Sequence, residues 1–145
     1  MSEFHVHVGE EVSFSKTVSE SDVYLFAGIT GDLAPNHVNE AYMAKSSFGR
    51  RIAHGALLVG FMSNCSTKIL EGRHTESETA VSLGYDRIRF LAPVFIGDTV
   101  TVTYRIAEID PDKRRSRSQI EVRNQDGTLV AVATHILAWV RNGEG

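Results

Sequence analysis

The sequence of 145 residues lacks several features that would assign it to a familiar class. It contains one cysteine, Cys65, so no disulfide can form within the chain, and a reducing compartment is favoured. The 15 Lys and Arg residues against 18 Asp and Glu residues leave a formal charge of −3. The chain therefore has no broad basic surface of the kind that binds nucleic acids.

Long apolar segments are also missing. The N-terminal sequence MSEFHVHVGE has no basic region followed by an apolar stretch, as a secretion signal requires. The most apolar stretch, IAHGALLVGFM, is too short to cross a bilayer and contains His54. No internal repeat or low-complexity segment stands out. We therefore expect one soluble, cytoplasmic domain over residues 1–145, with neither a membrane nor a nucleic acid as its partner.

In the first third of the chain, the pattern of residues predicts one strand and two short helices. Residues 11–18 alternate apolar and polar side chains, which is typical of a strand. Ser19 then offers an N-cap for a short helix over 20–28. Pro35 predicts a loop, because it lacks an N–H and restrains the residue before it. A second short helix is expected over 39–47.

Residues 55–70 form the strongest helix prediction. One face carries apolar side chains at helical spacing: Leu57, Leu58, Phe61, Met62, Cys65 and Ile69. The opposite face carries small residues: Ala56, Gly60, Ser63 and Thr67. A strand, another helix or a ligand could therefore approach the backbone closely on that face.

The remainder of the chain has the character of strands. The expected strands are 78–90, 99–109, 119–125 and 129–140, with residues 110–118 (DPDKRRSRS) as a polar connection. One strand, then helices, then four strands indicates an α+β fold in which an antiparallel sheet packs against one long helix.

Asp32 and His37 lie in the segment GDLAPNH, where Gly31 and Pro35 indicate a turn. A turn can bring two short side chains toward one point, and an acid and an imidazole can hold one water between them. One group can take a proton from that water while the other returns a proton to a substrate. Histidine, with an ordinary pKa of about 6.5, works in either direction at neutral pH. An acid in such a loop also often caps the turn, and a histidine often only fills space.

His54 and Gly55 stand where the long helix is expected to begin. The first N–H groups of a helix have no partner within the helix, and a glycine lets a ligand reach them. This is a plausible oxyanion site for a thioester carbonyl, although the same pair could simply shape the helix entry. Ser63 could hydrogen-bond a catalytic group or a substrate. No G-x-S-x-G motif surrounds it, so we reject a serine nucleophile.

A metal site is not expected. His5 and His7 form an H-x-H pair, and Asp32, His37 and His54 could cluster. The sequence nevertheless has neither an H-E-x-x-H motif nor a pair of cysteines.

Two basic groups are candidate contacts for the phosphates of a carrier. Arg87 and Arg89 alternate with apolar residues of an expected strand and so face away from its apolar side. The basic run consists of Lys113, Arg114, Arg115 and Arg117. Such charges also commonly serve as a solvated surface.

Three segments together resemble a known family. FAGITGDLAPNHVNEAYM is similar to the hydratase motif of MaoC-like dehydratases and R-specific enoyl-CoA hydratases, and FGRRIAHGALL and FLAPVFIGDTV continue the likeness. The resemblance implies a hotdog fold, a curved antiparallel sheet wrapped around one long central helix. It also implies a hydro-lyase of fatty acid metabolism that adds water to a trans-2-enoyl-CoA, giving an (R)-3-hydroxyacyl-CoA, or runs the reverse dehydration.

The resemblance also assigns roles to residues. Asp32 and His37 match the catalytic pair, Gly55 the backbone N–H that polarises the thioester carbonyl, and Ser63 a serine that supports the site. No metal or redox cofactor is implied, since the coenzyme A thioester is the substrate. One departure is visible: Ala34 stands where the family usually has asparagine, which puts substrate choice in doubt.

The resemblance implies a homodimer or higher oligomer, with a carrier cleft between subunits. Arg87, Arg89, Arg114 and Arg115 are then candidate phosphate contacts from either chain, for coenzyme A or for acyl carrier protein. Two alternatives stay open: a hotdog thioesterase, which would attack the carbonyl, and a non-catalytic protein that binds acyl thioesters.

Overall fold

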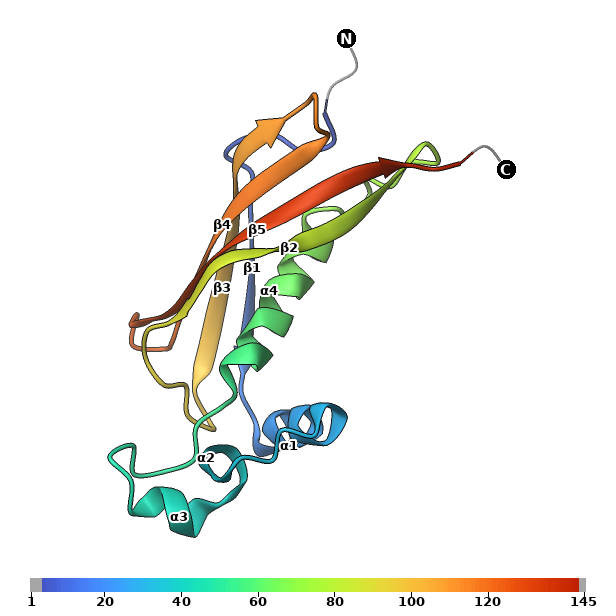
Figure 1. Ribbon diagram of the computed structural model, residues 1–145. Helices are drawn as coiled ribbons and strands as arrows, with labels where there is room; N and C mark the ends of the chain where they lie inside the picture. The colour runs from blue at the N-terminus through green and yellow to red at the C-terminus, as the bar shows by residue number, and fades with distance from the viewer. Residues whose placement is uncertain (1–3, 144–145) are drawn as a thin grey trace.

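A computed structural model describes residues 4–143 and shows a curved five-stranded sheet with one long helix along it (Figure 1). The strands are β1 (Glu11–Thr17), β2 (Glu78–Phe90), β3 (Thr99–Asp110), β4 (Arg115–Arg123) and β5 (Leu129–Arg141). Their order in the sheet is β1-β3-β4-β5-β2, and every neighbouring pair is antiparallel. The predicted α+β class and antiparallel sheet are confirmed.

The helices divide into a long one and a cluster of short ones. They are α1 (Glu20–Thr30), α2 (Pro35–Val38), α3 (Glu40–Ala44) and α4 (Gly55–Lys68). Helices α1 to α3 lie together near one end of the sheet, below the start of α4 in Figure 1. The prediction of a loop at Pro35 was wrong, because proline fits the first turn of a helix, where its missing N–H is not needed.

Side-chain hydrogen bonds fix the start of helix α1, and a glycine fixes its end. The Ser19 hydroxyl accepts the N–H of Asp22, and the Asp22 carboxylate accepts the N–H of Ser19, which completes a capping box. Gly31 ends the helix in the left-handed region with φ of 81°, where glycine meets no steric penalty. The chain therefore turns sharply just before Asp32.

Helix α4 packs its apolar face on the sheet, as predicted. Its buried side chains include Leu58, Met62 and Cys65, which join a core built from β3, β4 and β5. Burial raises the pKa of the Cys65 thiol to about 11. The four residues of the small face, Ala56, Gly60, Ser63 and Thr67, are all exposed.

The predicted polar connection over 110–118 was too long. Strand β4 already begins at Arg115, and its side chains alternate between exposed and buried along the whole strand. Ser116 and Ser118 occupy the inward positions and are fully buried, whereas Arg115 and Arg117 face outward. Serine at inward positions concealed the alternation of apolar and polar residues that marks a strand.

A polar group lies within the otherwise apolar core. His135 of β5 is fully buried, with 2.6 Å between its Nδ1 and the Tyr104 hydroxyl and 2.7 Å between its Nε2 and the Ser82 hydroxyl. Burial lowers the pKa of His135 to about 4. This ring therefore stays neutral at physiological pH.

Strand β2 forms one edge of the sheet. Its exposed apolar side chains include Val81, Leu83 and Phe90. The register shifts twice along its pairing with β5, after Ser82 and after Asp86. None of the helices within residues 4–143 is long and apolar enough to cross a membrane.

Candidate active site

The turn after α1 presents Asp32 at the surface and leads into α2, whose single turn carries His37. The His37 ring is 7% exposed, whereas Asp32 is exposed. The Asp32 carboxylate accepts a long bond of 3.4 Å from the Ala34 N–H, and within residues 4–143 it forms no ion pair. Its oxygens therefore remain available to a water or a substrate.

The hydrogen bond of His37 to the backbone defines its reactive atom. Nδ1 lies 2.8 Å from the carbonyl oxygen of Ile52. Because a carbonyl only accepts, Nδ1 carries the hydrogen and Nε2 of the neutral ring holds a lone pair. The Ile52 N–H in turn donates to the carbonyl of Asn36, at 2.9 Å, which ties α2 to the segment before α4. His37 is thus held as a potential base.

His54 completes the group. Its Nε2 donates to the carbonyl oxygen of Asp32, at 2.9 Å, and its ring stacks on that of His37 with centroids 3.6 Å apart. A carboxylate oxygen of Asp32 and one ring nitrogen from each histidine all lie within 4.8 Å of one another. The segment GDLAPNH and the residue before Gly55 therefore meet at one point, as the sequence predicted for Asp32 and His37.

Gly55 is the first residue of α4, so its N–H lies among the helix donors that lack an intrahelical partner. A Cβ added there would lie 2.6 Å from the ring of Phe90, so glycine allows Phe90 to pack directly against the backbone. A hollow of about 510 Å³ adjoins both residues. Its lining includes Asn36, His37, Phe48, Ile52, Leu58 and Leu91.

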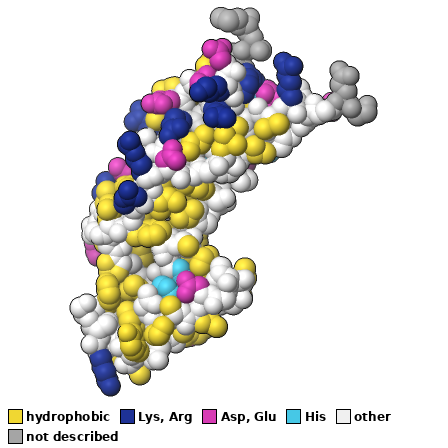
Figure 2. Space-filling model, viewed as in Figure 1, with side chains coloured by type: hydrophobic (Ala, Val, Ile, Leu, Met, Phe, Trp, Pro, Cys, Tyr) yellow, Lys and Arg dark blue, Asp and Glu magenta, His cyan; other side chains and the backbone are white. Residues whose placement is uncertain are grey.

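The surface around the group is largely apolar. Figure 2 shows histidine and acidic side chains side by side on one face, with hydrophobic side chains about them. Leu25 and Ile29 of α1 are exposed, and so is Leu33, which directly follows Asp32. An apolar acyl group therefore has surface to contact next to the polar group.

Arg51 holds the short helices in place. Its guanidinium pairs with Glu20 of α1 at 2.9 Å and with Glu40 of α3, and it also donates to the Tyr24 hydroxyl. The two carboxylates raise the pKa of this arginine. Because Ile52 directly follows Arg51, this network also restrains the segment that accepts the His37 hydrogen bond.

Ser63 lies two turns beyond Gly55 on the exposed small face of α4. Burial raises the pKa of Tyr85, and a hydrogen bond between Tyr85 and Ser63 opposes this rise. Ser63 thus contacts β2, and its predicted support of the catalytic group stays a prediction.

The predicted phosphate contacts lie at two ends of the sheet. Arg87 and Arg89 are exposed near the end of β2 that carries Phe90, where the register shift interrupts simple alternation. Arg114 lies at the far end and pairs with Glu78, lowering the pKa of that carboxyl to about 2. Of these three arginines, Arg87 and Arg89 belong to the end of β2 whose Phe90 packs on Gly55.

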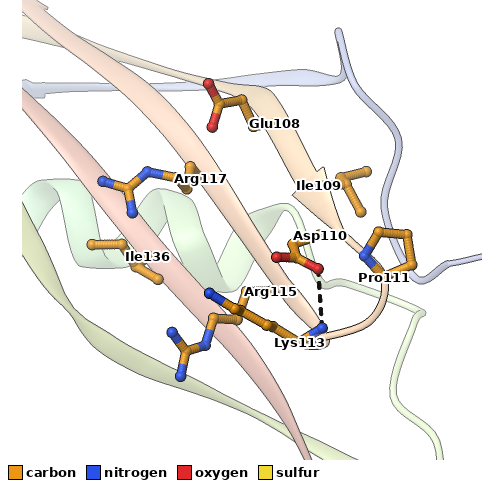
Figure 3. Close-up of a pocket in the computed structure, with 8 residues that line it drawn as sticks. All are labelled: Glu108, Ile109, Asp110, Pro111, Lys113, Arg115, Arg117 and Ile136. Carbon is orange, nitrogen blue, oxygen red and sulfur yellow. Dashed lines mark hydrogen bonds between the residues drawn. The ribbon is translucent and has the colours of Figure 1, made fainter.

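Arg115 borders a separate hollow of about 530 Å³ at the β3–β4 hairpin, shown in Figure 3. Its lining includes acidic side chains from β3 and basic side chains from the turn and β4, and the Asp110 carboxylate accepts the Lys113 N–H at 3.0 Å. This hollow is similar in volume to the one beside Gly55 but lacks a histidine or an unpaired helix N-terminus. Asp32, His37 and Gly55 therefore remain the candidate site.

Asp32, His37 and His54 bring three possible ligand atoms within 4.8 Å of one another, but the two stacked rings are poorly oriented to share one ion. The stacked rings of His37 and His54 are only 23° from parallel, so their in-plane lone pairs cannot both point at one ion about 2.0–2.1 Å away. His5 of the H-x-H pair instead stacks on Trp139 and lies 3.0 Å from Glu78. The expectation that no metal is required stays a prediction.

Two contacts of the group were missed by the sequence analysis. The side chain of His54 reaches the backbone of Asp32, 22 residues earlier in the chain, and the ring of Phe90 covers Gly55. No periodicity or spacing rule links such distant positions. The only available signal was the position of His54 directly before the helix.

Comparison with known proteins agrees with the sequence resemblance. The MaoC-like domain family matches residues 3–131. The (R)-specific enoyl-CoA hydratase of Rhodospirillum rubrum is 42% identical over 106 residues, covering 73% of this chain and 69% of that protein. The 3-hydroxybutyryl-CoA dehydratase of Methylorubrum extorquens is 39% identical over 112 residues, covering 77% of this chain and 68% of that protein.

Solved structures show the same architecture. The (R)-hydratase from A. caviae involved in PHA biosynthesis superposes with a TM-score of 0.83 at 28% identity, covering 92% of this chain and 96% of that one. A hot-dog-like protein from Thermanaerovibrio acidaminovorans, at 20% identity and a TM-score of 0.69, supports the fold alone; it covers 95% of this chain and 86% of that one. The predicted hotdog fold is confirmed, and the chain belongs to the MaoC-like domain family.

Proposed function

We propose that this protein is a hydro-lyase that adds water reversibly to a trans-2-enoyl thioester, giving the (R)-3-hydroxyacyl thioester. The family and the names of its relatives support this reaction. The single observation that carries it is the meeting of Asp32 and His37 beside the free N-terminus of α4 at Gly55.

The acid and the imidazole supply the proton transfers. A water held between the Asp32 carboxylate and His37 Nε2 attacks carbon 3 of the enoyl group, and one of the pair accepts its proton. The proton taken from the water is then delivered by this pair to carbon 2 on the same face, which gives syn addition and returns both groups to their starting state. Such positioned acid–base catalysis contributes about 10²–10⁴-fold to the rate.

The N-terminus of α4 supplies the electrostatic part. As carbon 3 is attacked, negative charge moves to the thioester oxygen, and the Gly55 N–H stabilises it together with the helix dipole. Removing one such donor typically costs about 10²–10³-fold in rate. Water is the only co-reactant in this scheme, so we expect no metal or redox cofactor.

The test follows the ultraviolet absorbance of crotonyl-CoA, which hydration removes. Wild type should consume the absorbance without releasing free thiol. Asp32→Asn should lower the rate about 10²–10⁴-fold, with an unchanged melting temperature because the side chain is exposed. Asp112→Asn, which changes an exposed acid at the far hairpin, is the matched control.

Other outcomes of this assay separate the alternatives. Release of free coenzyme A would identify a thioesterase and contradict the proposal. A panel of longer, branched and carboxylated enoyl-CoAs tests which acyl groups are accepted. The same acyl groups on acyl carrier protein test which carrier is accepted. Binding of this panel without turnover would identify a non-catalytic protein, and a fully active Asp32→Asn would remove Asp32 from the mechanism.

We also propose that the protein works as a homodimer or higher oligomer in the cytoplasm. The free edge of β2 and its exposed apolar side chains offer a second copy both backbone hydrogen bonds and apolar contact. Pairing there would place Arg87 and Arg89 near the junction of two chains. They remain our candidate contacts for the carrier phosphates.

A further inference from the structure

His54 is a buried ionisable side chain to which the hydration chemistry above gives no task. It is 2% exposed and belongs to neither the proton-transfer pair nor the oxyanion donor. It nevertheless contacts Asp32 through a hydrogen bond and His37 through ring stacking, and it directly precedes Gly55. One side chain thus touches or adjoins all three elements of the site.

We propose that His54 is a positioning residue, which holds the Asp32 backbone through its Nε2–H and the His37 ring through its face. The proposal rests on the proposed function, because the geometry it maintains is the geometry of hydration. His54 itself need not touch the substrate.

The hydrogen bond from His54 to Asp32 joins two segments that are far apart in the sequence. The other hydrogen bonds of Asp32 in the described chain are local, from its N–H to Thr30 Oγ1 at 3.1 Å and from the Ala34 N–H to its carboxylate at 3.4 Å. The His54 bond, at 2.9 Å, joins this exposed turn to the start of the long helix. It therefore sets how far the carboxylate lies from Gly55.

The stacking contact restrains the second catalytic group. The bond from His37 Nδ1 to Ile52 leaves the ring able to tilt about that bond. The face of His54, 3.6 Å away and nearly parallel, removes this freedom. Phe26 of α1 packs on His54, with centroids 4.7 Å apart, and so supports the stack. The lone pair of His37 Nε2 is thereby kept pointing in one direction.

The second nitrogen of His54 argues against simple space filling. Its Nδ1 is buried and has no hydrogen-bond partner, and it carries no hydrogen because Nε2 is the donor. A leucine or a phenylalanine would fill a similar volume without burying an unpaired nitrogen. Histidine supplies two features here: the Nε2–H, which donates a hydrogen bond, and the ring face, which stacks on His37.

Three substitutions separate these two contributions. His54→Gln keeps an N–H donor without an aromatic face, His54→Phe keeps the face without the donor, and His54→Leu keeps neither. Misplacement of reacting groups by about 1 Å can cost about 10²-fold. We expect kcat to fall about 100-fold in the leucine variant and less in the other two, with KM changed less than threefold. His74→Leu, at an exposed histidine, is the matched control.

A second readout does not depend on activity. Nitrogen-15 spectra of the histidine rings in the free protein report which nitrogen of His37 carries the hydrogen. Wild type and His54→Phe should show the Nδ1–H form, whereas His54→Leu should show a mixture, because a ring that lacks the stacking face can swing away from the Ile52 carbonyl. If His54→Leu shows this mixture but wild type hydrates no enoyl thioester, the proposed function fails while the positioning contact stands.

The positioning role is overturned if His54→Leu retains kcat within twofold of wild type. It is equally overturned if the three variants lose kcat only in proportion to their loss of folded protein, as measured by circular dichroism at the assay temperature. An unchanged His37 spectrum in the leucine variant would also contradict it.

Discussion

At the scale of single residues, the site depends on side chains that fix backbone as much as on those that react. The proximity of Asp32 and His37 and the place of Gly55 at the start of α4 could be predicted, because turn residues and helix-start residues follow local rules. The contribution of His54 could not, since its partner is a backbone carbonyl 22 residues away. Long-range contacts of this kind depend on the assembled fold.

Gly55 provides a prediction at this scale. Gly55→Ala places a methyl group 2.6 Å from the Phe90 ring, so that ring must move. Overpacking typically costs about 1–3 kcal/mol, and we expect the lower end, about 1 kcal/mol, because Phe90 is half exposed and can rotate. The rate of hydration should fall about tenfold or more, as the group beside the oxyanion donor is displaced.

A double-variant cycle measures this contact. In a Phe90→Ala background, the added methyl group at Gly55 should leave the free energy of unfolding almost unchanged. Urea titration measures this free energy in each variant. Equal costs of Gly55→Ala in both backgrounds would show that Phe90 does not press on the glycine.

At the scale of elements, hydrophobic periodicity predicted the structures that bury an apolar face. Helix α4 and strand β2 were correct in nearly every residue, because their patterns reflect one packed surface each. The start of β4 was missed where serines replace the inward apolar residues. The single turn of α2 was missed because four residues cannot display a period.

The buried polar group of β5 makes stability depend on acid. His135 has a pKa of about 4 in the folded protein, against about 6.5 for an unperturbed histidine. The unfolded chain therefore binds a proton first, and the free energy of unfolding should decrease as pH falls from about 6.5 to about 4. The full loss is about 3 kcal/mol.

Urea unfolding at several pH values checks this dependence. His135→Gln should flatten the decrease above about pH 4.5, since glutamine does not titrate, whereas His74→Gln should leave it unchanged. If His135→Gln does not fold, proton NMR of wild type provides the check: a ring that titrates above about pH 6 would refute the prediction. Glu78, whose pKa is lowered from 4.5 to about 2, loses its stabilising contribution as pH falls from about 4.5 to about 2, so it overlaps only the acid end of the His135 window.

At the scale of the whole molecule, the sequence predicted the class and order of elements, and the resemblance predicted the hotdog arrangement. The sequence alone could not predict which apolar surfaces are exposed. Within residues 4–143, β2 is an edge strand and the four residues of the small face of α4 are exposed. The proposed second copy would cover edge strand β2.

Sedimentation equilibrium tests this proposed pairing. Wild type should have at least twice the chain mass of 16.0 kDa. Leu83→Arg, which puts a charge on the exposed side of β2, should shift it toward the monomer. Val8→Arg, at an exposed position beside the opposite edge, should not. A monomeric wild type, or equal behaviour of the two variants, would exclude pairing through β2.

The seclusion of Cys65 in the core has a practical consequence for assays of this protein. Its side chain is fully shielded from solvent, and a thiol with a pKa of about 11 is almost entirely in its unreactive protonated form at neutral pH. A colorimetric thiol reagent added to the folded protein should therefore give no background colour. Any colour that develops with an acyl-CoA present then counts cleaved thioester directly, so hydration and hydrolysis can be followed in the same cuvette.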